Sequence, residues 1–279
     1  MRARLLGEVL PRVESSDSSL VVDDLHLSFQ AVKAIEGVGF NVHDGEILAI
    51  IGPNGAGKTS VFNCISGLYK PDSGSISFQG AEIVGLKPYR IANLGVARTF
   101  QNIELFPQMT VLDNLMLGRH RHLRYGTAAA MLRVGRAIRE EVRNREIVEA
   151  IVEFLELEPH RKSYVAMLPY GIQKRVELGR ALATEPRILM LDEPAAGMNL
   201  EETEDMARFV TDIRRELGIG VVLVDHDMRL VMDLADTVLA LEFGRPIAMG
   251  PPAEIQSNPD VIRAYLGEGK TASTPGGAS

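Results

Sequence analysis

The chain has 279 residues, of which 46% are hydrophobic and 24% are charged, and its formal net charge is -7 at pH 7. This length and composition predict a globular protein with a sizeable core and exclude a disordered or fibrous chain. The acidic balance disfavours a broad nucleic-acid-binding surface, which normally needs a basic footprint.

Residues 1–18 are predicted to form a flexible N-terminal tail. They begin with basic residues, but Glu8, Glu14 and the lack of a long apolar stretch argue against a signal peptide. Apolar runs such as Ile47–Ile51 are far shorter than the roughly 18 residues that cross a bilayer, so any membrane link is expected to run through a partner. The single cysteine, Cys64, excludes an intramolecular disulfide, suits a cytoplasmic protein and is expected to be a small buried filler.

Two kinds of strand are predicted along the chain. Apolar residues alternate over 25–29 and 38–42, which predicts antiparallel strands with one solvated face. Continuous apolar runs occur at Glu46–Ile51, Arg187–Leu191 and Gly220–Val224. Such runs are typical of strands that are buried on both faces of a parallel sheet.

Helical segments alternate with these buried strands. They are expected near Lys58–Ser66, Ile172–Thr184 and Glu201–Leu217, the last with Asn199 and Glu202 as its N-terminal cap. The alternation predicts a parallel sheet with crossover helices.

The middle of the chain, about Thr110 to Glu158, has mostly helical periodicity and is predicted to be a helical insertion. Thr110 and Asp113 give its start signal. The last residues, 269–279, are small and polar and are predicted to form a flexible tail, which leaves 19–268 as the folded domain.

The segment GPNGAGKT matches the P-loop pattern and lies between a buried strand and a helix, as that motif requires. Its glycines let backbone N–H groups converge on phosphate oxygens, Lys58 would neutralise the β- and γ-phosphates, and Thr59 would ligate magnesium. An ordinary glycine turn is the weaker alternative. The predicted nucleotide-binding residues are Gly52, Pro53, Asn54, Gly55, Ala56, Gly57, Lys58, Thr59 and Ser60.

Two carboxylates, Asp192 and Glu193, end a buried strand, where a parallel sheet opens its ligand crevice. Asp192 is predicted to hold magnesium directly or through water, and Glu193 to orient and deprotonate the attacking water. A strand-end turn with a helix cap is the alternative. Taken alone, His226 after another buried strand would more often be structural, and Gln101 and Phe29 carry little signal.

The segments GPNGAGKT, RTFQN, LPYGIQKRVELGRAL, ILMLDEPAAGMN and LVDHDM occur in this order. Their order and spacing resemble the nucleotide-binding subunits of ABC transporters over nearly the whole chain. The resemblance implies an α/β fold: a P-loop NTPase core with a small antiparallel β subdomain and an α-helical subdomain at about 102–184. It also implies ATP and Mg²⁺ as cofactors.

The same resemblance implies roles for single residues. Phe29 looks like the aromatic that stacks on adenine, Gln101 like the magnesium and water sensor, and His226 like the switch histidine. The helix from Gly171 resembles the signature helix, which caps the γ-phosphate bound by the opposite subunit. Ala195–Asn199 resembles the loop that links the two sites across the dimer.

Within the family, the chain most resembles ATPases of branched-chain (hydrophobic) amino acid importers. Asn258–Glu268, the RTFQN segment and the helical insertion carry this narrower resemblance. It implies transmembrane permease subunits, a second ABC ATPase subunit and, indirectly, a solute-binding protein as partners, and a peripheral location on the cytoplasmic face of the inner membrane. Urea importers and a lipopolysaccharide exporter have similar ATPases and remain alternatives.

The signature departs from the family pattern. Pro169 and Tyr170 replace the usual serine and glycine, and Asn199 stands where aspartate is usual. Proline offers a phosphate neither an N–H nor a hydroxyl. The hypothesis is that the site using this signature is impaired, whereas the P-loop site of this chain is the better one of an asymmetric pair.

Two further readings stay open. A soluble ABC ATPase of DNA repair or translation usually has two nucleotide-binding halves or long insertions, whereas this chain has one P-loop. A regulator that binds ATP without hydrolysing it is disfavoured, because the residues expected to carry out hydrolysis are all present: Lys58, Thr59, Asp192, Glu193 and His226. The basic run Arg119–Arg124 is interpreted as a solvated helix end, with lipid head groups or a permease as the alternative contact.

Overall fold

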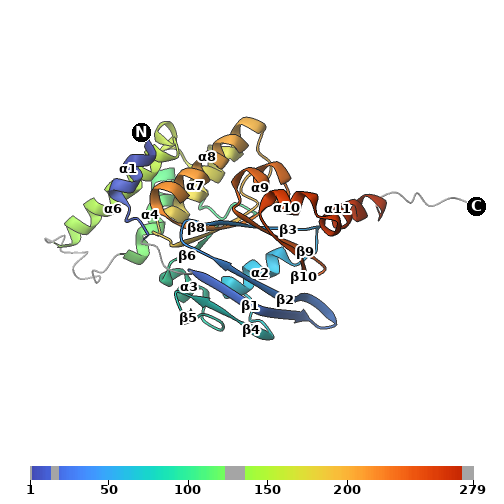
Figure 1. Cartoon of the computed structure of the whole chain (residues 1–279). Helices are drawn as coiled ribbons and strands as arrows, with labels where there is room; N and C mark the ends of the chain where they lie inside the picture. Colours follow the sequence, from blue (N-terminus) through green and yellow to red (C-terminus); the bar gives the residue numbers. More distant parts are fainter. Residues whose placement is uncertain (1, 14–18, 123–135, 272–279) are drawn as a thin grey trace, which may run out of the picture.

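A six-stranded sheet runs through the centre of the computed structural model, which describes residues 2–13, 19–122 and 136–271 (Figure 1). The strand order is β10-β9-β3-β8-β7-β6, and only β10 runs antiparallel to its neighbour. The strands are β3 (Ile47–Ile51), β6 (Val96–Arg98), β7 (Ile188–Asp192), β8 (Gly220–Val224), β9 (Thr237–Glu242) and β10 (Arg245–Gly250). The parallel sheet predicted from the apolar runs is confirmed.

Strand β3 shows why these runs form central strands. All five of its residues are buried, with Ile47 and Ala49 in the core on one face of the sheet and Leu48 and Ile50 in the core on the other. Successive side chains of a strand point to opposite faces, so a strand covered on both sides needs an unbroken apolar run.

A second, antiparallel sheet of order β2-β1-β4-β5 packs over one face, with helix α2 (Lys58–Ile65) between the two sheets (Figure 1). Its strands are β1 (Leu20–Phe29), β2 (Val32–Val42), β4 (Ser73–Phe78) and β5 (Ala81–Glu82). Phe62 of α2 is fully buried in this core. Leu25 and Leu27 point inward as predicted, whereas Phe29 is 45% exposed beyond an irregularity in the register of β1.

Most of the other helices cover the opposite face of the central sheet, whereas α3 packs on the side of the antiparallel sheet. Besides α2, the helical segments in the described ranges are α1 (Arg2–Val9), α3 (Pro88–Leu94), α4 (Val111–Gly118), η1 (Arg119–His122), α6 (Arg136–Phe154), η2 (Glu158–His160), η3 (Val165–Met167), α7 (Tyr170–Leu182), α8 (Leu200–Leu217), α9 (Met228–Leu234), α10 (Pro252–Ser257) and α11 (Pro259–Thr271). None of them, within those ranges, has the length and apolar composition to span a membrane.

Both predicted helix caps are present. Thr110 caps α4 and Asn199 caps α8, each in a reciprocal capping box with the residue three positions later, Asp113 and Glu202. Each box satisfies backbone N–H groups that the first helical turn leaves without a partner.

The N-terminal segment differs from the predicted flexible tail. Helix α1 packs against α6 and α8, and Leu6 and Leu10 are 0% and 4% exposed. The backbone N–H of Val13 donates to the carbonyl of Leu217 at 2.8 Å. The cause is a short apolar stripe spaced for a helix, which is too brief to register as a long hydrophobic run. At the other end, residues 269–271 belong to α11, and both 14–18 and 272–279 lie outside the described residues.

The interpretation of the basic run as a solvated helix end is wrong at its first residue. Arg119 is 3% exposed and donates to Glu185 Oε1 at 2.7 Å and to Asn144 Oδ1 at 3.0 Å. The guanidinium therefore joins η1 to α6 and to the turn after α7. Arg124 lies outside the described residues.

We expect Leu6→Ala to lower the free energy of unfolding by about 2–5 kcal/mol, because it leaves a cavity in a closed core. Denaturant unfolding of both proteins measures the difference. Val142→Ala on α6, at a side chain that is 50% exposed, is the control and should change stability by less than about 0.5 kcal/mol. Unchanged stability of Leu6→Ala would show that α1 is not docked.

Cys64 is buried in α2 as expected, and this burial raises the pKa of its thiol to about 12. Because the thiolate is the reactive form, we expect maleimide to label the folded chain very slowly near neutral pH and to label the unfolded chain quickly. Mass spectrometry with and without denaturant measures both rates. Rapid stoichiometric labelling of the folded chain would contradict this placement.

Candidate nucleotide-binding site

The P-loop joins β3 to α2 through glycines that no other residue could replace without strain. Gly52 has φ 147°, and a Cβ there would lie 2.2 Å from the carbonyl oxygen of Leu241. Gly57 has φ 99°, and its Cβ would lie 2.5 Å from the carbonyl oxygen of Ala34. No side chain caps the start of α2, so its first N–H groups point toward the loop as a phosphate cradle requires.

Lys58 places its ammonium inside this loop. Its Nζ donates to the carbonyl oxygens of Gly52 at 2.5 Å and Pro53 at 3.0 Å, and the residue is 9% exposed. A buried cation held at the start of a helix is suited to polyanionic phosphates.

A cleft of about 360 Å³ opens beside the P-loop. It brings together predicted residues from three distant segments: 54–60, Gln101 and Glu193. Further lining residues, which the sequence did not single out, are Val32, Lys33, Ala34 and Phe243.

The aromatic side chains near the cleft differ from the prediction. Phe29 is not among the residues that line it and instead packs edge-on against Tyr69, with ring centroids 5.2 Å apart. Phe243 lines the cleft and is 81% exposed. An exposed aromatic in the turn between two strands has no local pattern that marks it as functional, so sequence reasoning missed it. The role of Phe29 toward adenine stays a prediction.

Glu193 is held in an unusual backbone conformation. Its φ is 48°, and its N–H donates to the carbonyl of Val224 at 2.7 Å. A non-glycine residue in the left-handed region costs energy and is frequent at functional sites. The conformation turns the side chain away from the sheet and toward the cleft.

Two predicted residues, Gln101 and His226, lie at the Glu193 carboxylate. Gln101 Nε2 donates to Glu193 Oε2 at 2.9 Å, and His226 Nδ1 lies 3.8 Å from Glu193 Oε1. His226 is 66% exposed on the loop after β8. The ends of β6, β7 and β8 thus place an amide, a carboxylate and an imidazole around one point.

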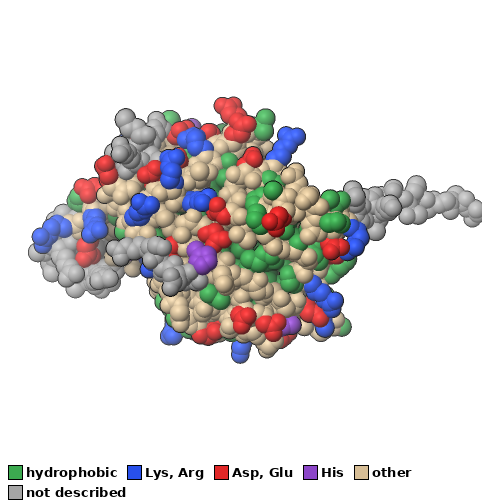
Figure 2. Space-filling view, in the orientation of Figure 1, with side chains coloured by type: hydrophobic (Ala, Val, Ile, Leu, Met, Phe, Trp, Pro, Cys, Tyr) green, Lys and Arg blue, Asp and Glu red, His purple; other side chains and the backbone are tan. Residues whose placement is uncertain are grey.

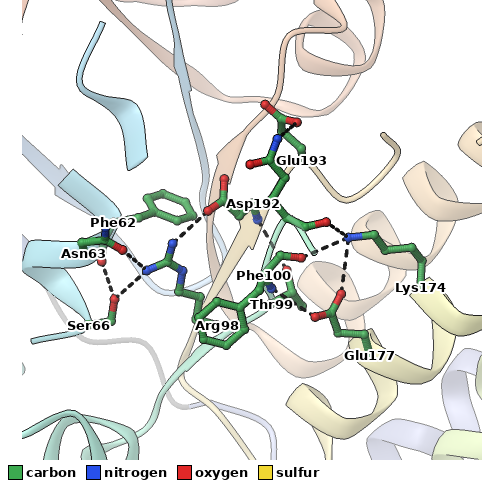
Figure 3. Close-up of polar contacts among 11 residues, drawn as sticks. Phe62, Asn63, Ser66, Arg98, Thr99, Phe100, Lys174, Glu177, Asp192 and Glu193 are labelled. Atoms are coloured by element: carbon green, nitrogen blue, oxygen red, sulfur yellow. Dashed lines mark hydrogen bonds and ion pairs between the residues drawn. The ribbon is translucent and has the colours of Figure 1, made fainter. Parts of the chain in front are cut away.

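Asp192 is anchored by an arginine that the sequence reading did not single out. Arg98 Nη2 donates to Asp192 Oδ2 at 2.9 Å, and Arg98 Nη1 donates to Asn63 Oδ1 at 2.7 Å and Ser66 Oγ at 3.0 Å (Figure 3). The guanidinium also lies over the rings of Phe62 and Phe100. Arg98 begins the RTFQN segment, in which Gln101 is the one residue predicted to act at the site.

The chemistry of the donor set fits magnesium. Thr59 supplies a hydroxyl, Gln101 an amide oxygen and Asp192 a carboxylate, and Mg²⁺ prefers such oxygen ligands. Thr59 and Gln101 line the same cleft. Asp192 is 4% exposed and engaged by Arg98, which favours contact through water over direct contact.

The divergent signature turn packs on its own chain. Helix α7 begins at Tyr170, with Pro169 as an N-cap that makes no side-chain hydrogen bond. A Cβ on Gly171 would lie 2.3 Å from Glu202 Oε1, and one on Gly197 would lie 3.3 Å from the Tyr170 ring. Gly171 is not among the residues that line the cleft described above.

One further contact reaches the P-loop from the C-terminal helix. The N–H of Gly52 donates to the hydroxyl of Tyr265 at 2.9 Å. Tyr265 lies in the segment that carried the narrower resemblance, but only the fold brings it to the nucleotide loop.

Family models match two parts of the chain. The model described as ABC transporter matches residues 35–196, which is more than half of the chain. The model described as branched-chain amino acid ATP-binding cassette transporter matches residues 245–271.

Curated relatives match over nearly their full length. The chain is 43% identical to the high-affinity branched-chain amino acid transport ATP-binding protein BraF of Pseudomonas aeruginosa, over 89% of this chain and 98% of that protein. It is 40% identical to LivG of Escherichia coli, a protein of the same description, over 91% and 99%. It is 32% identical to the lipopolysaccharide export system ATP-binding protein LptB of Haemophilus influenzae, over 90% and 98%.

Solved structures share the fold. The ADP conformation of an ATP-binding cassette of an ABC transporter matches with a TM-score of 0.78 at 29% identity, over 90% of this chain and 100% of that one. The P-loop core, its two subdomains and these similarities show that the chain belongs to the ATP-binding proteins of ABC transporters.

Proposed function

We propose that this chain hydrolyses ATP to drive the import of branched-chain amino acids through a membrane permease. The observation that carries the proposal is the convergence of the P-loop, Gln101 and Glu193 in one cleft. The solute class is supported by the match at 245–271 and by the printed functions of BraF and LivG.

The cleft residues divide the work of phosphoryl transfer. Lys58 and the P-loop amides hold the phosphates, and Thr59, Gln101 and Asp192 would hold a Mg²⁺ ion that would neutralise phosphate charge when bound. Glu193 accepts the proton of the attacking water as the oxygen–phosphorus bond forms.

Gln101 and His226 orient this base. One carboxylate oxygen of Glu193 accepts from the Gln101 amide, and the other faces His226. The fixed backbone of Glu193 limits the directions its side chain can take. Positioned in this way, the carboxylate meets the water along the line of attack.

We also propose that the chain works in an asymmetric pair of ATPases. Its signature turn would meet the γ-phosphate bound by the partner, but Pro169 donates no hydrogen bond, and the carboxylate of Glu202 lies against Gly171. Negative charge at this helix start opposes an arriving phosphate. The P-loop site of this chain, completed by a partner with a better signature, would then be the more active one.

An apolar groove of about 350 Å³ is our candidate for the permease contact. It lies among α2, α3, α4 and α7, and its lining includes Ile91, Leu117 and Phe100, the residue before Gln101. A permease segment seated there would sense the loop that carries Gln101. Attachment through this groove would place the chain peripherally on the cytoplasmic face of the inner membrane, with a solute-binding protein acting indirectly through the permease.

Lipid export is the second candidate, because the similarity to LptB covers 90% of this chain. The match at 245–271 favours amino acids. On the face seen in Figure 2, basic and acidic side chains are interspersed, which gives no support there to a nucleic-acid role. Uptake of labelled leucine by cells with and without the gene tests the solute: unchanged uptake would contradict import of this class.

We expect Glu193→Gln to reduce steady-state phosphate release from the assembled dimer by at least about 100-fold, because the variant lacks the proton acceptor. ATP binding should persist. Glu201→Gln, at an exposed position of α8, is the control and should keep full turnover. Retained activity in Glu193→Gln would sink the assignment of the base.

We expect Pro169→Ser to raise the turnover of a dimer of this chain alone about fivefold, because serine restores a donor toward the partner's γ-phosphate and one hydrogen bond contributes ~1 kcal/mol. Phosphate release measures the rate, and thermal unfolding separates it from a gain in stability. If Pro169→Ser is stabilised without faster turnover, the signature turn is not what limits the site.

A further inference from the structure

Helix α7 carries two charged residues that are buried although they do not line the cleft. Lys174 and Glu177 are each 2% exposed, and Lys174 Nζ lies 3.4 Å from Glu177 Oε2. Lysine and glutamate are almost never fully buried unless they are paired. Because removing two charges from water is costly, such a pair needs a reason beyond stability.

Both side chains bind the backbone of the loop after β6. Lys174 Nζ donates to the carbonyl oxygens of Phe100 at 3.0 Å and Gln101 at 2.9 Å. The Phe100 N–H donates to Glu177 Oε1 at 3.2 Å. Figure 3 shows the two side chains reaching this loop from α7. Three backbone groups of two consecutive residues are therefore held by one turn of one helix.

We propose that Lys174 and Glu177 are positioning residues that hold the loop so that the Gln101 amide meets Glu193. The inference rests on the proposed roles of Gln101 and Glu193. The Gln101 side chain is exposed and donates to Glu193 at 2.9 Å, so its aim depends on where its backbone is fixed. The carbonyl of Gln101 itself is one of the groups that Lys174 holds.

Two different parts of the fold, the central sheet and helix α7, form hydrogen bonds with the loop that carries Gln101. At its start, Thr99 Oγ1 accepts from the Asp192 N–H at 3.4 Å, which ties the loop to the central sheet. At its end, Lys174 and Glu177 tie it to α7 of the helical subdomain. A movement of α7 relative to the sheet would therefore move Gln101 relative to Glu193. Because α7 also begins with the signature turn, one rigid helix connects that turn to the chemistry of the cleft.

The neighbouring Arg175 gives a matched control. It lies on the same helix and is also a cation, but it pairs with Asp205 at 2.6 Å and lies over the ring of Phe209. The structure gives it no contact with the loop that carries Gln101 among the described residues. Arg175→Met therefore removes a partly buried charge from α7 and leaves the backbone contacts of the loop in place.

The test is a double-mutant cycle on ATP turnover of the full chain, with Lys174→Met and Gln101→Ala. We expect Lys174→Met to lower kcat about 10- to 100-fold, the scale of a misplaced catalytic group, with KM for ATP changed less than about threefold. If Lys174 acts through Gln101, Lys174→Met should cause little further loss when Gln101 is already alanine. Arg175→Met should keep kcat near that of the wild type.

Glu177→Gln is the second variant, because it keeps the size and an acceptor oxygen of the side chain. It keeps the inference testable if Lys174→Met fails to fold. Burial raises the pKa of Glu177, so this neutral side chain is tolerated there. We expect a smaller kcat loss that likewise disappears in the Gln101→Ala background.

Several outcomes would overturn the inference. Equal losses from Lys174→Met with and without Gln101 would show a structural role only, and so would a loss in Arg175→Met as large as in Lys174→Met. Full activity of Gln101→Ala would remove the target of the positioning. If Glu193→Gln hydrolyses ATP as fast as the wild type, the proposed function itself is overturned.

Discussion

The buried ion pair between Arg98 and Asp192 is the interaction on which the geometry of the site depends. It joins the ends of β6 and β7 and, through Asn63 and Ser66, the end of α2. A buried pair adds little net stability, but breaking one costs about 3–5 kcal/mol because a charge is left without its partner. The pair instead fixes geometry: it holds α2, the strand before Gln101 (β6) and the strand before Glu193 (β7) at fixed distances from one another.

The parts of the fold that could be predicted are those with a local cause. Strand β3 is an unbroken apolar run because both faces of the sheet are covered, and the P-loop glycines follow from carbonyls that leave no room for a Cβ. Glu193 and His226 could be expected at one edge of the sheet because each follows a predicted buried strand, whereas Gln101 was expected at the site only through the family resemblance.

The parts that could not be predicted depend on contacts between distant segments. Lys174 and Glu177, three residues apart, read in sequence as an ordinary exposed pair on a helix surface, and only the loop from β6 makes them buried. Arg119 likewise belongs to a run of basic residues that is predicted to be solvated. It is buried because it pairs with Glu185, which lies 66 positions away in the sequence. Phe243 reaches the cleft only because β9 and β10 turn beside the P-loop.

Helix α7 contributes to two sites: its start forms the signature turn, and its next turn contacts the loop that carries Gln101. The first turn of α7 follows Pro169, which offers a phosphate neither an N–H nor a hydroxyl, and neither Pro169 nor Tyr170 is among the residues that line the cleft. One turn later, Lys174 and Glu177 face inward and keep every contact with the loop that carries Gln101. A chain that had lost ATP chemistry altogether would have no physical need for the inward pair, whose burial is costly. In the proposed asymmetric dimer, the divergence at Pro169 would affect the nucleotide bound by the partner, while the contacts of Lys174 and Glu177 beside the cleft of this chain stay intact.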